Sequence, residues 1–486
     1  MDCDILLISP SYNRRLGSGI VPSIGLAYIA SFLRSSGFTP HILDCSLYFD
    51  DLSILTLEKM KEWLRKELLA HRPRFAIGIG PCTTPTVRSI QTIVETCRET
   101  YPTIPLIFGG PLAMIPEQEW LFFKELKASA IVKGDGEIPL RDILVCLREC
   151  KSISGIPGVQ VSEDEKIESF FVQDLDKLPY PAWDIFELGE YKPSVRRDLF
   201  VYPFAPIIGS RGCPFNCGFC VSGQYVEYRR QSYERTAAEA GFLRKNFGIR
   251  SLIFYDDALF SDKRKMDEEI QSFATLINEK APDVLWQIEI RPDLFSCISE
   301  GTFEYVYARG CRQMNIGVEK SSEDQLRTLH KPYSTHDLRE ACNLVSRTCP
   351  KMRLAGTFIL GGPGETAESI RETIEFSKEL SLLYAHYYPL ELYPGTPIYR
   401  SVLGKDQRLW FEKIMNDEKR WGEIIYESEN ISAPQLIEFV YSAYGCFYER
   451  KKWKEIATPF LGKYYDRVWA VAKLWQKDRF RLGGKC

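Results

Sequence analysis

The sequence has no surplus of basic residues, no long apolar run and no basic start. Its 62 Lys and Arg residues are matched by 65 Asp and Glu residues, and this balance argues against a nucleic-acid partner. No apolar run reaches the ~18 residues of a membrane span, since the nearest candidate, residues 20–33, is shorter and contains Pro22. The chain starts with the acidic stretch "MDCDILL", so we expect no secretory signal peptide.

Histidine is also scarce, whereas cysteine is not. The chain has 5 His and 15 Cys residues among 486. Without an export signal, this many cysteines predict a reducing compartment, with the cytoplasm as the default location. Clustered thiols in such a compartment bind metal more often than they form disulfides.

Residues 1–150 predict a doubly wound, Rossmann-like α/β domain, because short apolar runs alternate with helical patterns there. We expect strands at 4–9, 41–44, 75–80, 105–110 and 130–134, and helices at 24–37, 54–70 and 86–100. Ligands of open α/β sheets bind beyond the carboxyl ends of the strands, although a small residue there can also simply end its strand. The candidate binding residues at these ends are Ser9, Pro10, Asp44, Thr83, Gly109, Gly110, Gly134 and Glu137.

Two further regions follow. Residues 151–205 are rich in proline and aromatic residues and predict an ordered linker, and residues 206–400 predict a partial (β/α)6 barrel, because six β/α units stand in a row. Its strands are expected at 206–210, 251–255, 284–290, 314–318, 354–360 and 385–390. Residues 401–486 predict a helical region. Its basic end, 464–486, indicates either contact with a membrane surface or a helical cap with snorkelling Lys and Arg.

Three cysteines stand close together after the first barrel strand, with the spacing C-x3-C-x2-C: Cys213, Cys217 and Cys220. A structural zinc site usually has four ligands in two separated pairs, and no histidine lies nearby. Cluster proteins that only carry electrons usually supply four cysteines. Three thiolates therefore predict a [4Fe–4S] cluster with one iron open to a non-protein ligand, with structural zinc as the alternative.

This motif, with Phe219 before its last cysteine, resembles that of the radical S-adenosylmethionine (SAM) enzymes. The resemblance implies that SAM chelates the open iron and is cleaved to methionine and a 5′-deoxyadenosyl radical. It also implies SAM contacts at Asp256 in "FYDD", Arg291 in "EIRPDLF" and Glu319 in "NIGVEK". Gly361 in "GGPGET" is expected against the adenine. Lys320 departs from the serine that usually follows the glutamate.

The first domain, joined to the barrel through "LDKLPYPAWDIF", resembles that of the cobalamin-binding subclass. The resemblance implies cobalamin as a third cofactor, held by the loops 9–13, 44–46, 80–84, 109–112 and 134–137. No histidine here lies in the D-x-H-x-x-G pattern that ligates cobalt in many cobalamin proteins. We therefore expect cobalt without a histidine ligand.

By this resemblance the protein is expected to be a methyltransferase that moves a methyl group from methylcobalamin to an unactivated carbon of a small-molecule or peptide substrate. An external reductant such as flavodoxin or ferredoxin is implied, and no catalytic residue can be named. One alternative is a non-methylating reaction, such as ring closure or rearrangement. Another is a methylthiotransferase with a second cluster near Cys45 and Cys82. A cobalamin carrier without chemistry would have no use for an open iron.

Overall fold

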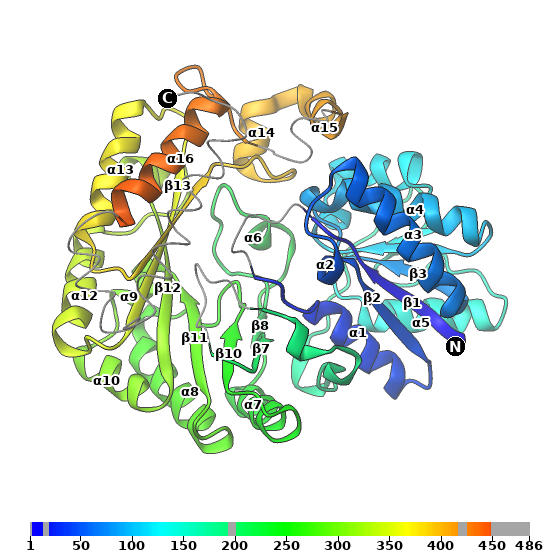
Figure 1. Cartoon of the computed structure of the whole chain (residues 1–486), viewed down its shortest axis with the longest axis horizontal. Coiled ribbons are helices and arrows are strands. Elements are labelled where there is room, and N and C mark those ends of the chain that lie inside the picture. Colours follow the sequence, from blue (N-terminus) through cyan, green and yellow to red (C-terminus); the bar gives the residue numbers. More distant parts are fainter. Residues whose placement is uncertain (1, 13–18, 193–200, 417–424, 449–486) are drawn as a thin grey trace.

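The computed structural model describes residues 2–12, 19–192, 201–416 and 425–448. It contains two six-stranded sheets whose neighbouring strands are parallel, apart from one short edge strand, and both carry helices. The sheets lie side by side, with the short helix α6 (Ser222–Tyr225) between them (Figure 1).

The first sheet has the strand order β2-β1-β3-β4-β5-β6. Its strand β1 is buried on both faces, because Ile5 and Leu7 enter one core while Leu6 and Ile8 enter the other. Helices α1 and α5 cover the first face, and α3 and α4 cover the second. The bounds are β1 Asp2–Ser9, β2 Pro40–Asp44, β3 Arg72–Ile79, β4 Leu106–Gly109, β5 Ala130–Val132, β6 Val159–Gln160, α1 Ile24–Ser35, α3 Ile54–Ala70, α4 Val87–Thr100 and α5 Glu137–Arg148.

The segment between the two sheets packs against both of them over its described residues. Trp183, Phe186 and Tyr191 are buried in the core that α1 and α5 share with the second sheet. Tyr191 also donates a hydrogen bond of 2.9 Å to Asp44 at the end of β2. The segment therefore packs across both sheets and is not a loose tether.

The second sheet has the order β14-β13-β12-β11-β10-β7, so its strands follow one another in sequence around an open arc. Each strand lies within three residues of the expected position. Helices on the outer side of this sheet connect consecutive strands, so that strands and helices alternate along the chain (Figure 1). The bounds are β7 Phe204–Ile207, β10 Ser251–Phe254, β11 Leu285–Ile290, β12 Cys311–Glu319, β13 Arg353–Leu360, β14 Tyr384–Pro389, α7 Tyr233–Phe247, α8 Met266–Lys280, α10 Glu300–Ala308, α12 Thr335–Thr348 and α13 Ala367–Glu379.

The C-terminal region is helical where it is described, with α14 (Pro397–Leu403), α15 (Gln407–Asn416) and α16 (Ala433–Tyr448). Helix α16 packs on the edge strand β14, and the Tyr448 hydroxyl donates to the Ala385 carbonyl at 3.2 Å. A helix across an edge strand protects its unpaired backbone groups.

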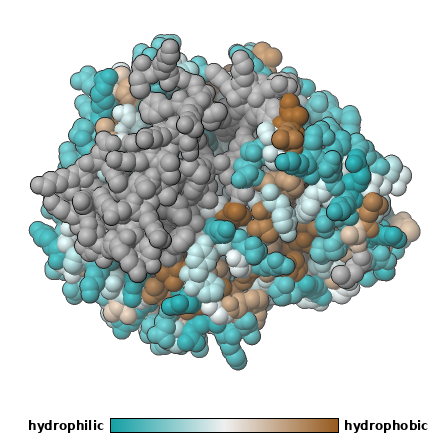
Figure 2. Space-filling view, in the orientation of Figure 1, coloured by the Kyte–Doolittle hydropathy of each residue, from teal (hydrophilic) through white to brown (hydrophobic). Residues whose placement is uncertain are grey.

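No described helix has the length and apolar character needed to cross a membrane. Most of the coloured surface in Figure 2 is hydrophilic, with smaller hydrophobic areas. The expected basic helix at 464–486 lies outside the described residues.

Candidate functional site

The three cysteines lie on a loop that folds back on itself at the carboxyl end of β7. We call residues 212–225 the cysteine loop; it starts after β8 (Ser210–Arg211), which pairs with β9 (Arg229–Arg230). Gly212 has φ +74°, and a Cβ there would lie 2.6–2.7 Å from the carbonyl oxygens of Glu227 and Val226. Only glycine fits this bend.

The thiols of the cysteine loop share a partly buried environment. Burial raises the pKa of Cys213 to about 11, with smaller contributions from Asp257 and the other two thiols. Burial also raises the pKa of Cys220. The Arg291 guanidinium donates to Cys217 Sγ at 3.3 Å and lies over the Phe215 ring. A cation is thus already placed beside one of the three potential thiolates.

The donor set suits an iron–sulfur cluster. Within the described part of the chain, no three His, Cys, Asp or Glu side chains are arranged to hold a single metal ion. In a cluster each thiolate binds a different iron, so the thiols need only surround it and need not meet at one point. Thiolates are also the ligands that such clusters prefer.

Phe219 anchors the cysteine loop. Its half-buried ring packs on a small apolar cluster that includes Leu329 and Ile398. The neighbouring Gly218 donates its N–H to the Leu329 carbonyl at 2.8 Å and accepts from the Ile398 N–H at 3.0 Å. The position between the second and third cysteines is therefore held by two barrel elements.

A cavity of about 150 Å³ opens beside the cysteine loop at the carboxyl ends of β10 to β13. We call it the barrel cavity. It contains two of the residues expected to contact SAM, Arg291 and Glu319. Its lining consists of Asp257, Ala258, Phe260, Glu289, Ile290, Arg291, Leu294, Asn315, Ile316, Gly317, Glu319, Lys331 and Thr357.

Asp256, another expected SAM contact, does not line the barrel cavity. Its Oδ1 accepts from the Gly209 N–H at 2.9 Å and from the Ser210 hydroxyl at 2.5 Å. It ties the start of the cysteine loop to β10. The next residue, Asp257, faces the barrel cavity and contributes to the raised pKa values of Cys213 and Cys220.

Glu319 is held by a lysine that the sequence did not single out. Lys331 Nζ lies 2.7 Å from Glu319 Oε1, and both side chains are about 7% exposed. Glu319 has φ +64°, a left-handed backbone conformation that is uncommon outside glycine. This strained turn at the end of β12 directs the carboxylate into the barrel cavity.

Gly361 lies in the turn after β13, which Lys320 and Glu365 stabilise. Gly361 does not line the barrel cavity. Lys320 Nζ donates to the Gly361 carbonyl at 3.1 Å and pairs with Glu365, and both charged side chains are buried. Burial lowers the pKa of Lys320, while Glu365 raises it. Gly361 has φ +79°, and a Cβ there would meet Leu436 of α16 at 2.6 Å.

A second cavity of about 600 Å³ lies at the carboxyl ends of the first sheet. We call it the sheet-end cavity. Ile208, Arg211 and Tyr255 close it from the barrel side. Its lining includes seven of the eight residues expected at cobalamin, namely Ser9, Pro10, Thr83, Gly109, Gly110, Gly134 and Glu137.

The eighth residue, Asp44, is turned away from the sheet-end cavity. Its Oδ2 accepts from the Tyr191 hydroxyl and its Oδ1 from the Ser46 N–H and hydroxyl. Burial raises the pKa of Asp44, and these hydrogen bonds lower it. Ser46, from the same expected loop, does line the cavity, while Asn13 of the first loop lies outside the described residues.

Cys45 and Cys82 do not form a second metal site in this structure. Both are fully buried in the core beneath α3 and α4. Cys82 donates to the Ile79 carbonyl at 3.4 Å, and burial raises its pKa to about 12. Neither lines the sheet-end cavity, so the arrangement does not suit the second cluster of a methylthiotransferase.

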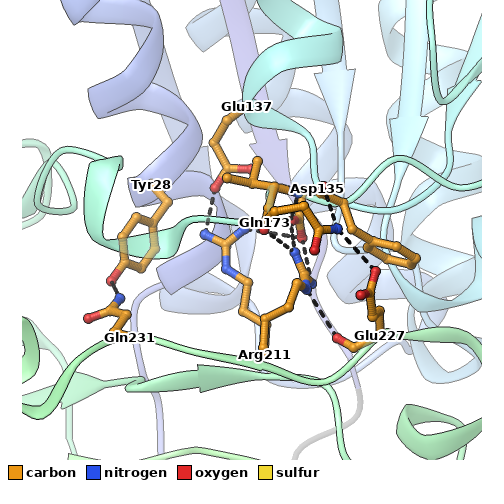
Figure 3. Close-up of polar contacts among 10 residues, drawn as sticks. Tyr28, Asp135, Glu137, Gln173, Arg211, Glu227 and Gln231 are labelled. Atoms are coloured by element: carbon orange, nitrogen blue, oxygen red, sulfur yellow. Dashed lines mark hydrogen bonds and ion pairs between the residues drawn. The ribbon is translucent and has the colours of Figure 1, made fainter.

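A buried group of four charges joins the loop after β5 to the β8–β9 ribbon beside the sheet-end cavity. Arg211 of the barrel lies 2.6 Å from Glu137 Oε1 and 3.1 Å from Asp135 Oδ1 (Figure 3). Arg229 pairs with the same Asp135. Arg229 also donates to the Val172 carbonyl at 2.8 Å. No periodic pattern in the sequence marks these pairs, because their members are more than seventy positions apart.

The far end of the cysteine loop contacts the first sheet as well. Tyr225 and Val221 pack against the core beneath α3 and α4. Arg400 lies 2.8 Å from Glu117 and donates to the Tyr225 hydroxyl at 2.6 Å. Both ends of the cysteine loop are thus held between the two halves of the protein.

Comparison with known proteins agrees with this geometry. The model of the radical SAM superfamily matches residues 207–377. An uncharacterised methyltransferase of Pyrococcus horikoshii is 27% identical over 463 residues, which cover 92% of this chain and 93% of the relative. An anaerobic magnesium-protoporphyrin IX monomethyl ester cyclase of Rubrivivax gelatinosus is 22% identical, covering 92% of this chain and 78% of the relative.

Solved structures show the same fold. The radical SAM methyltransferase TsrM of Kitasatospora setae, with cobalamin and a [4Fe–4S] cluster bound, aligns with a TM-score of 0.63 at 18% identity, covering 83% of this chain and 78% of TsrM. The cobalamin-dependent S-adenosylmethionine radical enzyme OxsB, with aqua-cobalamin bound, aligns with a TM-score of 0.65 at 16% identity. The alignment covers 98% of this chain and 72% of OxsB. Residues 207–377 are therefore a radical SAM domain, and the chain shares the overall fold of TsrM and OxsB.

Proposed function

We propose that this protein is a cobalamin-dependent radical SAM methyltransferase that methylates an unactivated carbon of a small-molecule or peptide substrate. One observation carries the proposal: the cysteine loop has a neighbour in each of the two cavities, because Arg211 directly before it lines the sheet-end cavity and Arg291, which donates to Cys217, lines the barrel cavity. In this proposal residues 1–150 are a Rossmann-like cobalamin-binding domain, 151–205 a linker, 206–400 a (β/α)6 radical SAM barrel and 401–486 a helical region.

The barrel side holds the cluster and SAM. Cys213, Cys217 and Cys220 would carry the [4Fe–4S] cluster, which supplies the electron for SAM cleavage when bound. Arg291 and Glu319 offer SAM a cation and an anion from the wall of the barrel cavity. Asp257 replaces Asp256 as the proposed contact after β10, because only Asp257 faces the cavity. Gly361 and Phe219 act by shaping the turns around SAM and the cluster.

The sheet-end cavity is the proposed site of cobalamin, which would carry the methyl group. Glycine backbone and apolar side chains make up much of its wall, and such walls admit a large, flat ligand. Among the described residues that line it, none is His, Cys or Met, the protein ligands that transition metals commonly take through nitrogen or sulfur. Cobalt would therefore have no strong ligand from the described wall of the cavity. Asp44 supports the site through Ser46 and Tyr191.

Ring closure is the second candidate function. Two relatives that are 22% identical over 92% of this chain are anaerobic magnesium-protoporphyrin IX monomethyl ester cyclases, from Rubrivivax gelatinosus and Cereibacter sphaeroides. The same two cavities would serve both reactions, so the product decides between them.

An external one-electron donor, such as flavodoxin or ferredoxin, is part of the proposal, because the described chain offers one cysteine loop for a cluster and no second metal site. We further propose a cytoplasmic location. The 15 cysteines of the chain suit a reducing compartment.

The function is tested by anaerobic turnover with methyl-labelled SAM. A methyltransferase will place the label in an organic product and consume two SAM for each methyl transferred, with one 5′-deoxyadenosine formed. Deoxyadenosine without labelled product would overturn methyl transfer and favour ring closure or rearrangement.

Replacing Cys213, Cys217 and Cys220 together by alanine is expected to remove all cluster iron. Wild-type protein reconstituted without oxygen should hold about four irons per chain, measured by iron and sulfide assay. The matched control replaces Cys146, Cys150 and Cys297, which lie away from the loop and are exposed or half-buried, and should keep the iron. Iron that remains in the triple-alanine variant would refute the assignment of the cluster to these three cysteines. About eight irons per chain in the wild type would restore the methylthiotransferase alternative.

Asp257→Asn is expected to weaken SAM binding about tenfold, equal to about 1.4 kcal/mol, because it removes an anion that faces the positively charged ligand. Equilibrium dialysis of labelled SAM with reconstituted protein measures this. Asp256→Ala should leave the SAM affinity within about twofold and lower the melting temperature instead, since it leaves the Gly209 N–H without its acceptor. If Asp256→Ala weakens SAM binding and Asp257→Asn does not, Asp256 is the residue that contacts SAM.

Gly109→Val is expected to weaken cobalamin binding at least tenfold (about 1.4 kcal/mol) while keeping the cluster iron. A Cβ at Gly109 meets only ordinary contacts, at 3.8 Å or more, so the fold tolerates the change while the side chain fills the cavity. Gly189→Val, where a Cβ meets nothing within 4 Å, is the control. Unchanged affinity in Gly109→Val would place cobalamin elsewhere.

The EPR spectrum of bound cob(II)alamin reports on the axial ligand in the same samples. We expect no strong superhyperfine splitting from a single nitrogen, because the described cavity wall contains no histidine. A clear single-nitrogen pattern would show that an imidazole or cobalamin's own base occupies the cobalt.

A further inference from the structure

Arg211 has an unusual position, because it lies at the sheet-end cavity and directly before the cysteine loop. It lines the sheet-end cavity and precedes the first cysteine of the cysteine loop by two residues. Its side chain is only 14% exposed and is paired with Asp135 and Glu137, whose side chains are 9% and 3% exposed. Both carboxylates line the sheet-end cavity themselves.

The connection from Arg211 to Cys213 has little freedom. Gly212 between them lies against the backbone carbonyls of Val226 and Glu227, closer than a side chain would allow. On the other side, Arg211 pairs in register with Arg229 across the β8–β9 ribbon. A displacement of the Arg211 guanidinium is therefore passed to the cysteine loop and is not absorbed within it.

The charges around Arg211 balance. Arg211 and Arg229 supply two cations, and Asp135 and Glu137 supply two anions. The neighbouring carboxylates raise the pKa of Arg211, so it stays charged. A planar guanidinium can hold two carboxylates in a fixed geometry, which a lysine cannot do. The Tyr28 ring lies 5.1 Å from the guanidinium carbon and limits its movement further.

We propose that Arg211 is a positioning residue that couples the two cofactor sites, so that an occupied sheet-end cavity increases the affinity of the cluster for SAM. The inference rests on the proposed function. A ligand that contacts Asp135 and Glu137 changes the position of their carboxylates, and the ion pairs pass this change to Arg211 and to the start of the cysteine loop. If the position set by the bound ligand is the one in which SAM binds best, the two ligands bind with positive cooperativity.

The coupling is measured as a ratio of dissociation constants. In reconstituted, full-length protein, the Kd of labelled SAM is determined with and without saturating hydroxocobalamin, and the Kd of hydroxocobalamin with and without SAM. Linkage requires the two ratios to be equal. We expect about a tenfold ratio in the wild type, within the usual range of such couplings, and less than about twofold in Arg211→Met. Arg211→Lys should fall between them.

Arg230→Met is the matched control. Arg230 is the neighbour of Arg229 on the same ribbon, but it contacts Tyr233 and Glu269 within the barrel and no residue of the first sheet. It should keep the tenfold ratio. A ratio of one in the wild type, or an undiminished ratio in Arg211→Met, would overturn the coupling while leaving the proposed function intact. A wild type that takes up no cobalamin would overturn the proposed function itself.

Loss of cluster iron in Arg211→Met would mean that the variant does not fold correctly, and the test then moves to the other domain. Glu137→Gln keeps the shape of the side chain and removes one of the two charges that hold Arg211. With its cluster iron retained, this variant should lower the ratio to below about threefold. A tenfold ratio in Glu137→Gln would overturn the proposal.

Discussion

The loop after β5 meets the β8–β9 ribbon through one buried group of charges, Asp135 and Glu137 with Arg211 and Arg229. Burying charges is costly unless each one is paired and hydrogen-bonded. Here the pairs form only when the loop after β5 faces the β8–β9 ribbon. We therefore interpret the group as a feature that selects one arrangement of the sheets, and not as a source of stability.

This arrangement turns the carboxyl ends of both sheets toward the cysteine loop. The carboxyl ends are where open α/β sheets and β/α barrels place their ligands, so two binding regions that are far apart in sequence come to share one loop. Arg211 holds the start of this loop, and Tyr225 with Arg400 holds its end. Radical chemistry benefits from such an enclosed space, because it keeps water away from reactive species.

Within the barrel, one unusual residue has a structural explanation. Lys320 stands where the family usually has serine, and it pairs with Glu365 while donating to the Gly361 carbonyl. The lysine thus ties the end of β12 to the turn after β13, next to the strained Glu319. A buried pair of this kind is destabilising when one partner is lost, so Lys320 and Glu365 would have to change together.

The sequence by itself determined the order of strands and helices, because periodicities of two and 3.6 residues are local. It also indicated the three cysteines as a candidate cluster site, because their spacing lies within a single loop. Seven of the eight candidate residues at the strand ends line the sheet-end cavity, because the carboxyl ends of parallel strands meet at one edge of the sheet. Only the tertiary structure decided which of Asp256 and Asp257 faces the barrel cavity, since alternation at a strand end depends on the last paired residue. It alone placed Asp44 against Tyr191, Lys331 beside Glu319 and Arg211 between the two sites. These contacts join residues that are distant in sequence, and no local pattern carries the geometry with which two sheets pack.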